Sequence, residues 1–354
     1  MLRLFSAIVI TTFYFGLLIY PVLRIIDLIA PQVAFNTPFL LTVIVAPLLP
    51  RMLYEWRSGR FTRVCAALAF TWLGCYFMAF IPVLAFEAMN LALPLHPATA
   101  GWTLVLITAV LCLYAFLNAQ RLRVTDIDVA APAYVGGLRI AQISDVHVGS
   151  RRSGFLERVI ERLNMLQPDV VMITGDLIDF HAVGEEELAS LARLDAPAYF
   201  CAGNHERYVG LEDICERLRN LGVHVLRNES VEVGDLQIIA IDDADSRSQV
   251  KRFLPAIEAL PGHFRILLYH RPDGAEAAAD WGVHLMLCGH THAGQIFPFN
   301  FLVRRMFRRL SGVYHIGTMV LNVSSGTGTW GPVMRLGSAS EIGMICLTAK
   351  NERF

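Results

Sequence analysis

Long uncharged segments fill the first third of the chain, and short alternating elements fill the rest. No Asp, Glu, Lys or Arg occurs within residues 4–23, 28–50, 64–86 or 88–120. Each run can supply the roughly 20 apolar residues that a bilayer-spanning helix needs. We therefore predict a membrane anchor over residues 1–120, with four transmembrane helices at 4–23, 35–50, 64–86 and 101–119.

The arginines around these segments predict their orientation. With the N-terminus inside, the outer loops hold only Arg24, whereas the inner flanks hold Arg3, Arg51, Arg57, Arg60, Arg63, Arg121 and Arg123. Cytoplasmic loops are enriched in Lys and Arg. We expect a multi-pass protein of a bacterial inner membrane with its C-terminal domain in the cytoplasm. The rival interpretation of residues 1–30, a cleaved signal peptide, needs a shorter apolar run and a small-residue cleavage site.

From residue 124 the pattern changes to apolar strands that alternate with amphipathic helices. We predict strands at 138–144, 169–175, 197–202, 236–241, 265–270, 283–288, 313–316, 319–324 and 342–347. We predict helices at 153–166, 185–193, 211–221, 250–259 and 273–280. This alternation indicates one α/β domain over residues 121–354.

Composition restricts the partners and the covalent cross-links that we expect. The net charge of −1 gives no field that would attract nucleic acid, so no nucleic-acid partner is expected. The seven cysteines are odd in number and show no CxxC spacing, which disfavours a disulfide framework and fits a reducing compartment.

Asp, Asn and His side chains follow the predicted strands in five short motifs. They are Asp145-Val-His147, Gly175-Asp176-Leu-Ile-Asp179, Gly203-Asn204-His205-Glu206, His270 and Gly289-His290-Thr-His292. Ligands of open α/β sheets gather at the carboxyl ends of the strands. Oxygen and imidazole donors in this mix suit borderline divalent metals. A carboxylate such as Asp176 can bridge two metals, and a pair of metals is suited to hydrolysing phosphate esters.

In this order the motifs resemble the calcineurin-like metallophosphoesterase superfamily, over residues 138–326. The resemblance implies a four-layer α/β/β/α sandwich with a dimetal site at one edge. It implies that Asp145, His147, Asp176 and His292 hold one metal, and that Asp176, Asn204, His270 and His290 hold the other. It also implies that His205 is the general acid and that Asp179 orients His205. Two divalent ions are expected as cofactors, Mn²⁺ first, with Fe²⁺ and Zn²⁺ also fitting these ligands.

Within the superfamily, the segments Gly289–Gln295 and Ser324–Gly328 resemble bacterial membrane-associated phosphodiesterases. Some relatives cleave the pyrophosphate of UDP-2,3-diacylglucosamine. The soluble form of that enzyme has Arg where His205 stands, which argues against the soluble subtype and leaves a membrane-bound analogue open. We expect hydrolysis of a phosphodiester or pyrophosphate bond in a lipid-linked or nucleotide-sugar-lipid substrate at the inner membrane surface.

Residues 299–310 form a predicted basic amphipathic helix. Its apolar face would hold Phe299, Val303, Met306, Phe307 and Leu310, and its basic face Arg304, Arg305, Arg308 and Arg309. Such helices lie in membrane interfaces. The alternative is a helix packed on the domain with its arginines in water. Similarly, Arg151 and Arg152 are either substrate contacts or a solvated loop pair.

Two other functions remain to be weighed. A membrane-tethered sensor or scaffold could bind a nucleotide without turnover, although the full ligand set argues against it. Amidohydrolases also use His-x-His, but they need a lysine or equivalent bridge and a (β/α)₈ layout that this strand count does not give. The histidines without motif context are predicted to be surface or structural residues: His96, His181, His224, His263, His284 and His315. His181 is the first candidate for an exception, because it follows Asp179 closely.

Overall fold

The computed structural model describes residues 14–34, 36–45, 48, 52, 59–181 and 183–349. The chain forms two compact units. One comprises Met1–Leu117 with Gly331–Met334, and the other comprises Asn118–Trp330 with Arg335–Phe354.

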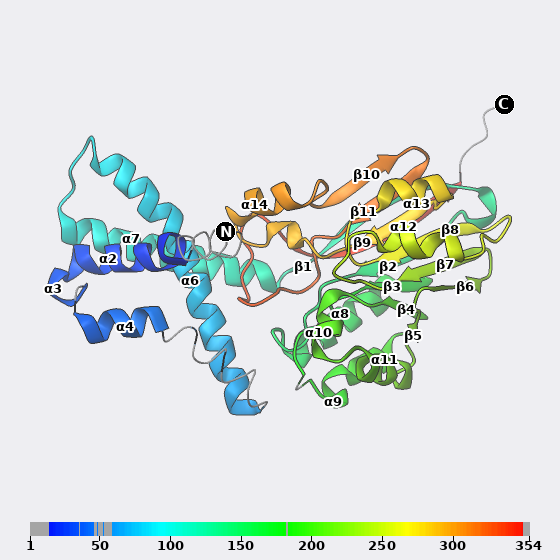
Figure 1. Ribbon diagram of the computed structural model, residues 1–354, viewed down its shortest axis with the longest axis horizontal. Helices are drawn as coiled ribbons and strands as arrows, with labels where there is room; N and C mark the ends of the chain where they lie inside the picture. The colour runs from blue at the N-terminus through cyan, green and yellow to red at the C-terminus, as the bar shows by residue number, and fades with distance from the viewer. Residues whose placement is uncertain are drawn as a thin grey trace. The chain divides into compact units, whose positions relative to one another are not determined.

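Helices make up the described part of the first unit: η1 (Tyr14–Ile19), α2 (Tyr20–Ile29), α3 (Pro31–Ala34), α4 (Thr37–Val45), α6 (Arg60–Asn90) and most of α7 (Pro97–Gln120) (Figure 1). Apolar side chains of α2, α6 and α7 share one core, which includes Leu28, Val83 and Leu104. A Cβ on Gly101 would lie 3.1 Å from Cβ of Leu28 and closer still to Ile29. The small residue therefore lets α7 approach α2.

Two described helices, Phe61–Asn90 and Pro97–Gln120, are long and apolar enough to cross a membrane. They coincide with the predicted spans at 64–86 and 101–119. The other two predicted spans lie partly outside the described residues. The described part of 4–23 forms η1 and the start of α2, and the described part of 35–50 lies mainly in α4. Arg24, expected in an outer loop, lies inside α2 and pairs with Glu87 at 2.6 Å and Asp27 at 2.8 Å.

Two six-stranded sheets form the second unit. The first sheet has the order β1 (Leu122–Ala131), β12 (Ser340–Ala349), β2 (Arg139–Ile143), β3 (Val170–Thr174), β4 (Ala198–Cys201) and β5 (His224–Val225). The second has the order β10 (Gly312–Ile316), β11 (Met319–Val323), β9 (Leu285–Cys288), β8 (Phe264–Tyr269), β7 (Leu236–Ile241) and β6 (Glu229–Val233). Strands β2 to β5 are parallel, and so are β7, β8, β9 and β11.

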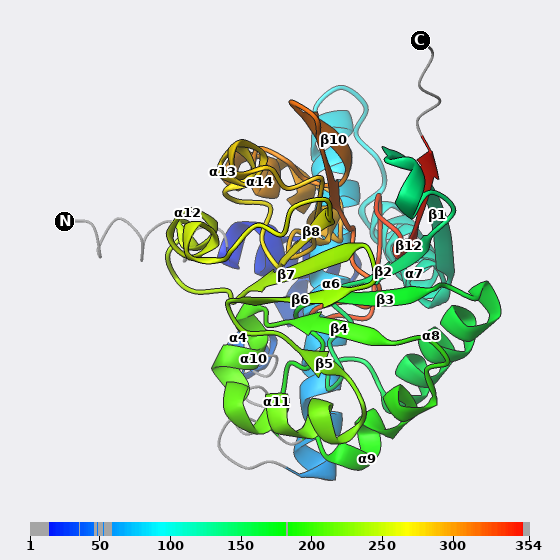
Figure 2. The same cartoon turned by 90° about the vertical axis from the view of Figure 1, so that its right-hand side faces the viewer.

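Helices cover the outer faces of these sheets (Figures 1 and 2). Beside the first sheet lie α8 (Ser153–Leu166), α9 (Glu185–Leu188), α10 (Asn204–Val209) and α11 (Leu211–Asn220). Beside the second lie α12 (Gln249–Phe253) and α13 (Ala275–Trp281), whereas α14 (Phe299–Met306) lies toward the ends of its strands. Short 3₁₀ turns complete the set: η2 (Ala133–Val135), η3 (Ala189–Arg193), η4 (Leu254–Ala256) and η5 (His292–Gly294).

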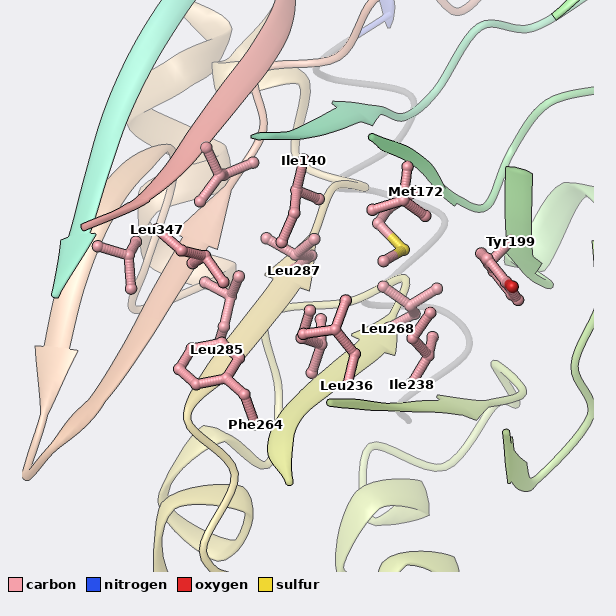
Figure 3. Packing of buried hydrophobic residues seen from close by; sticks show 14 of the residues in the cluster. Ile140, Met172, Tyr199, Leu236, Ile238, Phe264, Leu268, Leu285, Leu287 and Leu347 are labelled. Atoms are coloured by element: carbon pink, nitrogen blue, oxygen red, sulfur yellow. The ribbon is translucent and has the colours of Figure 1, made fainter. Parts of the chain in front are cut away.

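The main core lies between the two sheets, where Ile140 and Met172 of one face Leu268 and Leu287 of the other (Figure 3). Alternation along β7 divides its side chains between two clusters. Ile238 belongs to the core between the sheets, and Ile239 belongs to the cluster that includes α12 and α13. Successive strand residues point to opposite faces, and both faces of β7 are covered, so its sequence is apolar at every position except Gln237.

The predicted strands all occur, with ends shifted by a few residues at most, and α8 has its predicted bounds. The fold is a mixed α/β arrangement, as the alternating pattern predicted, with the two sheets that the family resemblance implied. Strand β1 was not predicted, because it is an edge strand that carries Arg123, Asp126 and Asp128 among its outward positions. The short strands β5 and β6 and the helix α10 were also missed.

Candidate metal centre

The motif residues come together at the carboxyl ends of parallel strands from both sheets. Asp145 and His147 follow β2, Asp176 follows β3, and Asn204 begins α10 just after β4. From the second sheet, His270 follows β8, and His290 and His292 follow β9. Candidate metal ligands from two sheets therefore lie at one edge of the sandwich, as expected for the C-terminal ends of parallel strands.

One group of three side chains consists of Asp145, His147 and His292. One potential ligand atom from each lies within 4.8 Å of the others. Nε2 of His147 lies 3.1 Å from Nε2 of His292, and Nε2 of His292 lies 3.2 Å from Oδ1 of Asp145. Two imidazole nitrogens and a carboxylate oxygen that converge in this way form a donor set for a divalent metal.

A second group consists of Asp176, His270 and His290, again with potential ligand atoms within 4.8 Å of one another. Nε2 of His270 lies 3.0 Å from Oδ2 of Asp176 and 3.1 Å from Nδ1 of His290. Nδ1 of His270 lies 2.8 Å from the carbonyl oxygen of Thr174. This contact requires the proton on Nδ1 and leaves the lone pair of a neutral ring on Nε2, directed at the group.

Asp176 belongs to the second group and also faces the first. Its Oδ2 is 3.0 Å from His270 and 4.0 Å from Nε2 of both His147 and His205. Its Oδ1 accepts the backbone N–H of His205 at 2.9 Å. A single carboxylate oxygen thus faces imidazoles from both groups, which is the position that a bridging ligand would take.

The backbone is strained at these residues. Asp145, His147, Asp176, His290 and His292 all have positive φ, between 50° and 72°. Left-handed conformations are uncommon for residues other than glycine and persist where the surrounding structure enforces them, frequently at functional sites. The neighbouring glycine Gly175 has no room for a side chain, since a Cβ there would lie 2.7 Å from Nδ1 of His270.

The buried charges favour a cation. Burial opposes ionisation of Asp176, but His270 and His205 outweigh that effect and hold its pKa well below its usual value. Burial likewise disfavours charge on His270, yet Asp176 raises the pKa of His270 to about 10. The negative charge that holds a proton on this imidazole would equally attract a metal ion, which displaces the proton on binding.

The donor set therefore fits two divalent cations. Asn204 supports this fit, because its buried Oδ1 has no hydrogen-bond partner among the described residues. A buried amide oxygen without a partner is costly and needs an explanation. A metal coordinated by Asn204 beside Asp176, His270 and His290 would supply one. The seven ligand assignments remain predictions that this geometry supports.

Asp179 has a different neighbour from the one expected. Its Oδ2 lies 3.5 Å from Nδ1 of His147, and its Oδ1 accepts the backbone N–H of Ser150 at 2.9 Å. The described hydrogen bonds do not join it to His205. We therefore expect Asp179 to orient the ligand His147, in place of the general acid. His205 lies with Nε2 toward Asp176, and its side chain is 18% exposed.

Glu206, the last residue of the third motif, has a role that the sequence analysis missed. Its fully buried carboxylate accepts the backbone N–H groups of Asp176, Leu177, Ile178 and Gly203 at 2.7–3.1 Å. Burial and the charge of Asp176 raise the pKa of Glu206 to about 7, opposed by the backbone donors. Glu206 thus fixes the loop that carries Asp176. Its spacing of three from Gly203 is the capping-box signal that could have revealed this.

Arg335 was also missed, and its guanidinium is fully buried. It donates to the carbonyl oxygens of His292, Ser325, Gly326 and Gly328 at 2.7–3.3 Å. It thereby ties the segment Ser324–Gly328 to the backbone of a predicted ligand. No local pattern marks such an arginine, because its partners are backbone atoms that the fold brings together.

Two other predictions need correction. Arg151 is not part of a solvated pair. It is buried against Phe155 and donates to Ala119 O and Gln120 Oε1 at 3.3 and 3.2 Å, whereas Arg152 is exposed.

The predicted helix 299–310 ends at Met306, and its predicted apolar face is divided. Val303, Phe307 and Leu310 pack together in the protein, so the packed alternative holds for them. Phe299 and Met306 remain 44% and 52% exposed.

Comparisons with known proteins agree with this geometry. A family model for calcineurin-like phosphoesterases matches residues 138–294. An uncharacterized metallophosphoesterase of Campylobacter jejuni is 32% identical over 263 residues, covering 70% of this chain and 69% of that protein. A transmembrane protein with metallophosphoesterase domain of Danio rerio is 35% identical over 272 residues, covering 69% and 61%. Phosphodiesterase YaeI of Escherichia coli is 36% identical over 141 residues, covering 37% and 51%. The chain thus spans about half to two thirds of the length of these relatives.

Proposed function

Because the chain belongs to the calcineurin-like metallophosphoesterases, which hydrolyse phosphoric esters, we propose that it cleaves a phosphodiester or pyrophosphate bond with two divalent cations. The observation that carries this proposal is the position of Asp176, whose Oδ2 faces both groups of ligands. Asp145, His147, Asp176 and His292 would hold one cation, and Asp176, Asn204, His270 and His290 the other. We propose Mn²⁺ as the metal, although Fe²⁺ and Zn²⁺ suit the same donors.

Bound cations would neutralise phosphate oxygens and lower the pKa of a water that attacks phosphorus. The protein's own contribution to leaving-group departure is His205, whose Nε2 faces the centre and could donate a proton to the departing oxygen. Burial lowers the pKa of His205 to about 4, with Asp176 opposing the shift. The negative charge of a bound phosphate would therefore have to keep the proton on this ring.

The substrate we propose is lipid-linked, or a nucleotide-sugar-lipid, cleaved at the inner surface of a bacterial inner membrane. Residues 1–120 would form the four-helix, multi-pass anchor, and residues 121–354 the cytoplasmic catalytic domain. Two long apolar helices support membrane association, and so does the resemblance to a protein named as transmembrane. The name of the Escherichia coli relative supports a phosphodiesterase.

Helix α14 supports action at a lipid surface. Phe301, Leu302 and Met306 are 61%, 39% and 52% exposed. Arg304 and Arg305 beside them are exposed as well. The helix packs next to η5, the turn that begins at His292, since a Cβ on Gly294 would collide with Asn300. Exposed apolar and basic side chains of this kind suit an anionic membrane interface. We propose that α14 contacts the bilayer beside the metal centre.

The test is an assay of the full-length chain in detergent with Mn²⁺ and bis-p-nitrophenyl phosphate. We expect His205→Ala to keep its metal content and to lose about 10²–10⁴-fold in turnover. His315→Ala changes an exposed histidine on β10 and should behave as the unaltered protein. Loss of metal together with activity in His205→Ala would contradict the role of His205. Bound metals without any turnover by the unaltered chain would favour the nucleotide-binding sensor or scaffold.

The lipid-linked substrate has its own test. A strain that lacks the protein should accumulate one phosphorylated lipid intermediate, detectable by lipid profiling. An unchanged lipid profile would argue against this substrate class and leave the phosphoesterase activity itself untouched.

A further inference from the structure

Two exposed aromatic side chains stand beside His205. The ring centroid of Tyr208 lies 5.7 Å from that of His205, and the centroid of Trp330 lies 6.3 Å from it. Both rings meet the imidazole edge to face, at interplanar angles of 62° and 67°. Tyr208 is 58% exposed and Trp330 is 51% exposed. The two largest side chains next to the predicted general acid are therefore open to solvent, although large apolar rings usually gain by burial.

The backbone of Trp330 is fixed in place. The side-chain amide of Gln295 donates to the carbonyl oxygen of Trp330 at 3.0 Å, and its Oε1 accepts the N–H of Trp330 at 2.9 Å. Gln295 is itself held close to the centre, since its backbone N–H donates to the carbonyl oxygen of His292 at 2.8 Å. This reciprocal pair joins the end of the last metal motif to Trp330. An exposed ring on an anchored backbone loses little conformational freedom when it binds a ligand.

The chemistry of His205 identifies which part of a substrate would meet these rings. A general acid must lie within hydrogen-bonding reach of the oxygen that leaves. The group attached to that oxygen must then extend past His205. Nε2 of His205 faces Asp176, whereas Tyr208 and Trp330 lie around the same ring. Flat aromatic faces bind planar rings by stacking and tolerate different ring chemistries.

We propose that Tyr208 and Trp330 form a leaving-group subsite that binds a planar aromatic ring, such as a nucleobase or an aryl group. This inference rests on the proposed function, because the role of His205 defines the leaving-group side. It adds to that function a substrate class: phosphoesters whose departing alcohol or phosphate carries a planar ring. Gln295 acts as a positioning residue for Trp330.

The experiment compares two diesters whose leaving groups have similar acidity but different shapes: methyl phenyl phosphate and methyl hexafluoroisopropyl phosphate. The full-length chain in detergent with Mn²⁺ is assayed by ³¹P NMR. We expect Trp330→Ala to lower kcat/KM about 10- to 100-fold for the phenyl ester, the range that loss of one stacking partner gives. The hexafluoroisopropyl ester should lose much less, and Trp330→Phe should retain most of the preference for the phenyl ester.

Tyr134→Ala is the matched control, because Tyr134 is a 49% exposed aromatic residue in η2, at the opposite end of β2 from the centre. It should leave both esters unchanged. Equal losses for the two esters in Trp330→Ala would overturn the subsite, since they would mean that Trp330 merely supports His205 or the fold. So would the absence of any loss for the phenyl ester.

A binding measurement tests the proposed subsite independently of the proposed hydrolytic activity. By calorimetry with Mn²⁺, the unaltered chain should bind AMP more tightly than ribose 5-phosphate, and Trp330→Ala should remove that difference. If neither ester is hydrolysed, the proposed function fails, and equal affinity for the two ligands then overturns the subsite as well. If the esters are hydrolysed but the two ligands bind equally well, only the subsite is overturned.

Discussion

The predicted metal ligands and the aromatic side chains near them differ in burial at the same edge of the sandwich. Asp145, His147 and His270 have no exposed surface, whereas Trp330 is 51% exposed and Phe301 is 61% exposed. The ligands are held by backbone contacts at strand ends, and the outer residues by loops and a short helix. We propose that the buried residues hold the metals and that the exposed aromatic residues contact the substrate.

Among the substitutions in the buried metal centre, Asp176→Asn should cause the largest loss of metal and activity. The change removes the charge of a carboxylate that faces both ligand groups. We expect loss of at least one metal per chain and about 10³-fold lower turnover, since metal stabilisation of a phosphoryl oxygen contributes several kcal/mol. Metal content by mass spectrometry and turnover of bis-p-nitrophenyl phosphate measure both effects.

A matched control for Asp176→Asn lies at the other end of the same strand. Asp169 precedes β3 and accepts the backbone N–H of Arg139 at 2.7 Å. Asp169→Asn should retain both metals and full turnover. If Asp176→Asn behaved in the same way, the bridging position would be excluded.

Glu206→Gln should show how far metal binding depends on the hydrogen bonds that hold the Asp176 loop. A neutral amide has one acceptor oxygen, where the carboxylate of Glu206 serves four backbone N–H groups with two. We expect metal affinity to fall about 10- to 100-fold, as for other residues that orient ligands. The melting temperature should fall as well, because buried donors lose their acceptors. Metal titration and thermal unfolding in detergent provide the readouts.

Glu187→Gln offers a close comparison, because Glu187 stands three residues after Gly184 in the same capping arrangement, away from the metal motifs. It should lower stability slightly and leave metal affinity unchanged. Equal loss of metal affinity in both variants would show that the effect of Glu206→Gln is not specific to the Asp176 loop.

The double variant Phe301→Ser and Leu302→Ser should affect only the contact of α14 with lipid. If α14 contacts lipid, the double variant should turn over a phosphodiester lipid in anionic nanodiscs several-fold more slowly, while its rate on soluble bis-p-nitrophenyl phosphate stays unchanged. Met165→Ser, at a residue of α8 that is 67% exposed, is the control and should change neither rate. Equal slowing on the soluble and the lipid substrate would remove the membrane contact from the proposal.

Residues in local motifs could be predicted from the sequence, whereas residues whose partners are distant in the chain could not. The convergence of Asp176 and His292 on one edge was predictable, because candidate ligands appear as local motifs at strand ends, and strands such as Leu236–Ile241 appear as largely apolar runs. The support from Arg335 was not predictable, since its partners are distant backbone carbonyls. Trp330 could not be placed beside His205 because 125 positions separate them in the chain, so only the folded arrangement joins them.

His284 provides the smallest expected effect and a test of the division between ligand and structural histidines. Strand β9 has His284 just before it and His290 just after it. His284 stacks on Phe264, and its Nδ1 accepts the N–H of Arg265 at 2.9 Å. Burial, and then the charge of Arg265, lower its pKa from 6.5. The unfolded chain therefore binds a proton more readily than the folded one.

It follows that the stability supplied by neutral His284 is fully present above about pH 6.5 and decreases as the pH falls below that value. His284→Asn keeps an acceptor oxygen but cannot titrate, so its melting temperature should depend less steeply on pH between about 5 and 7 than that of the unaltered chain. Metal content should stay the same, because His284 lies at the far end of the strand from the centre. Loss of metal in this variant would mean that the two ends of β9 are not independent, and that motif context does not separate ligands from structural histidines.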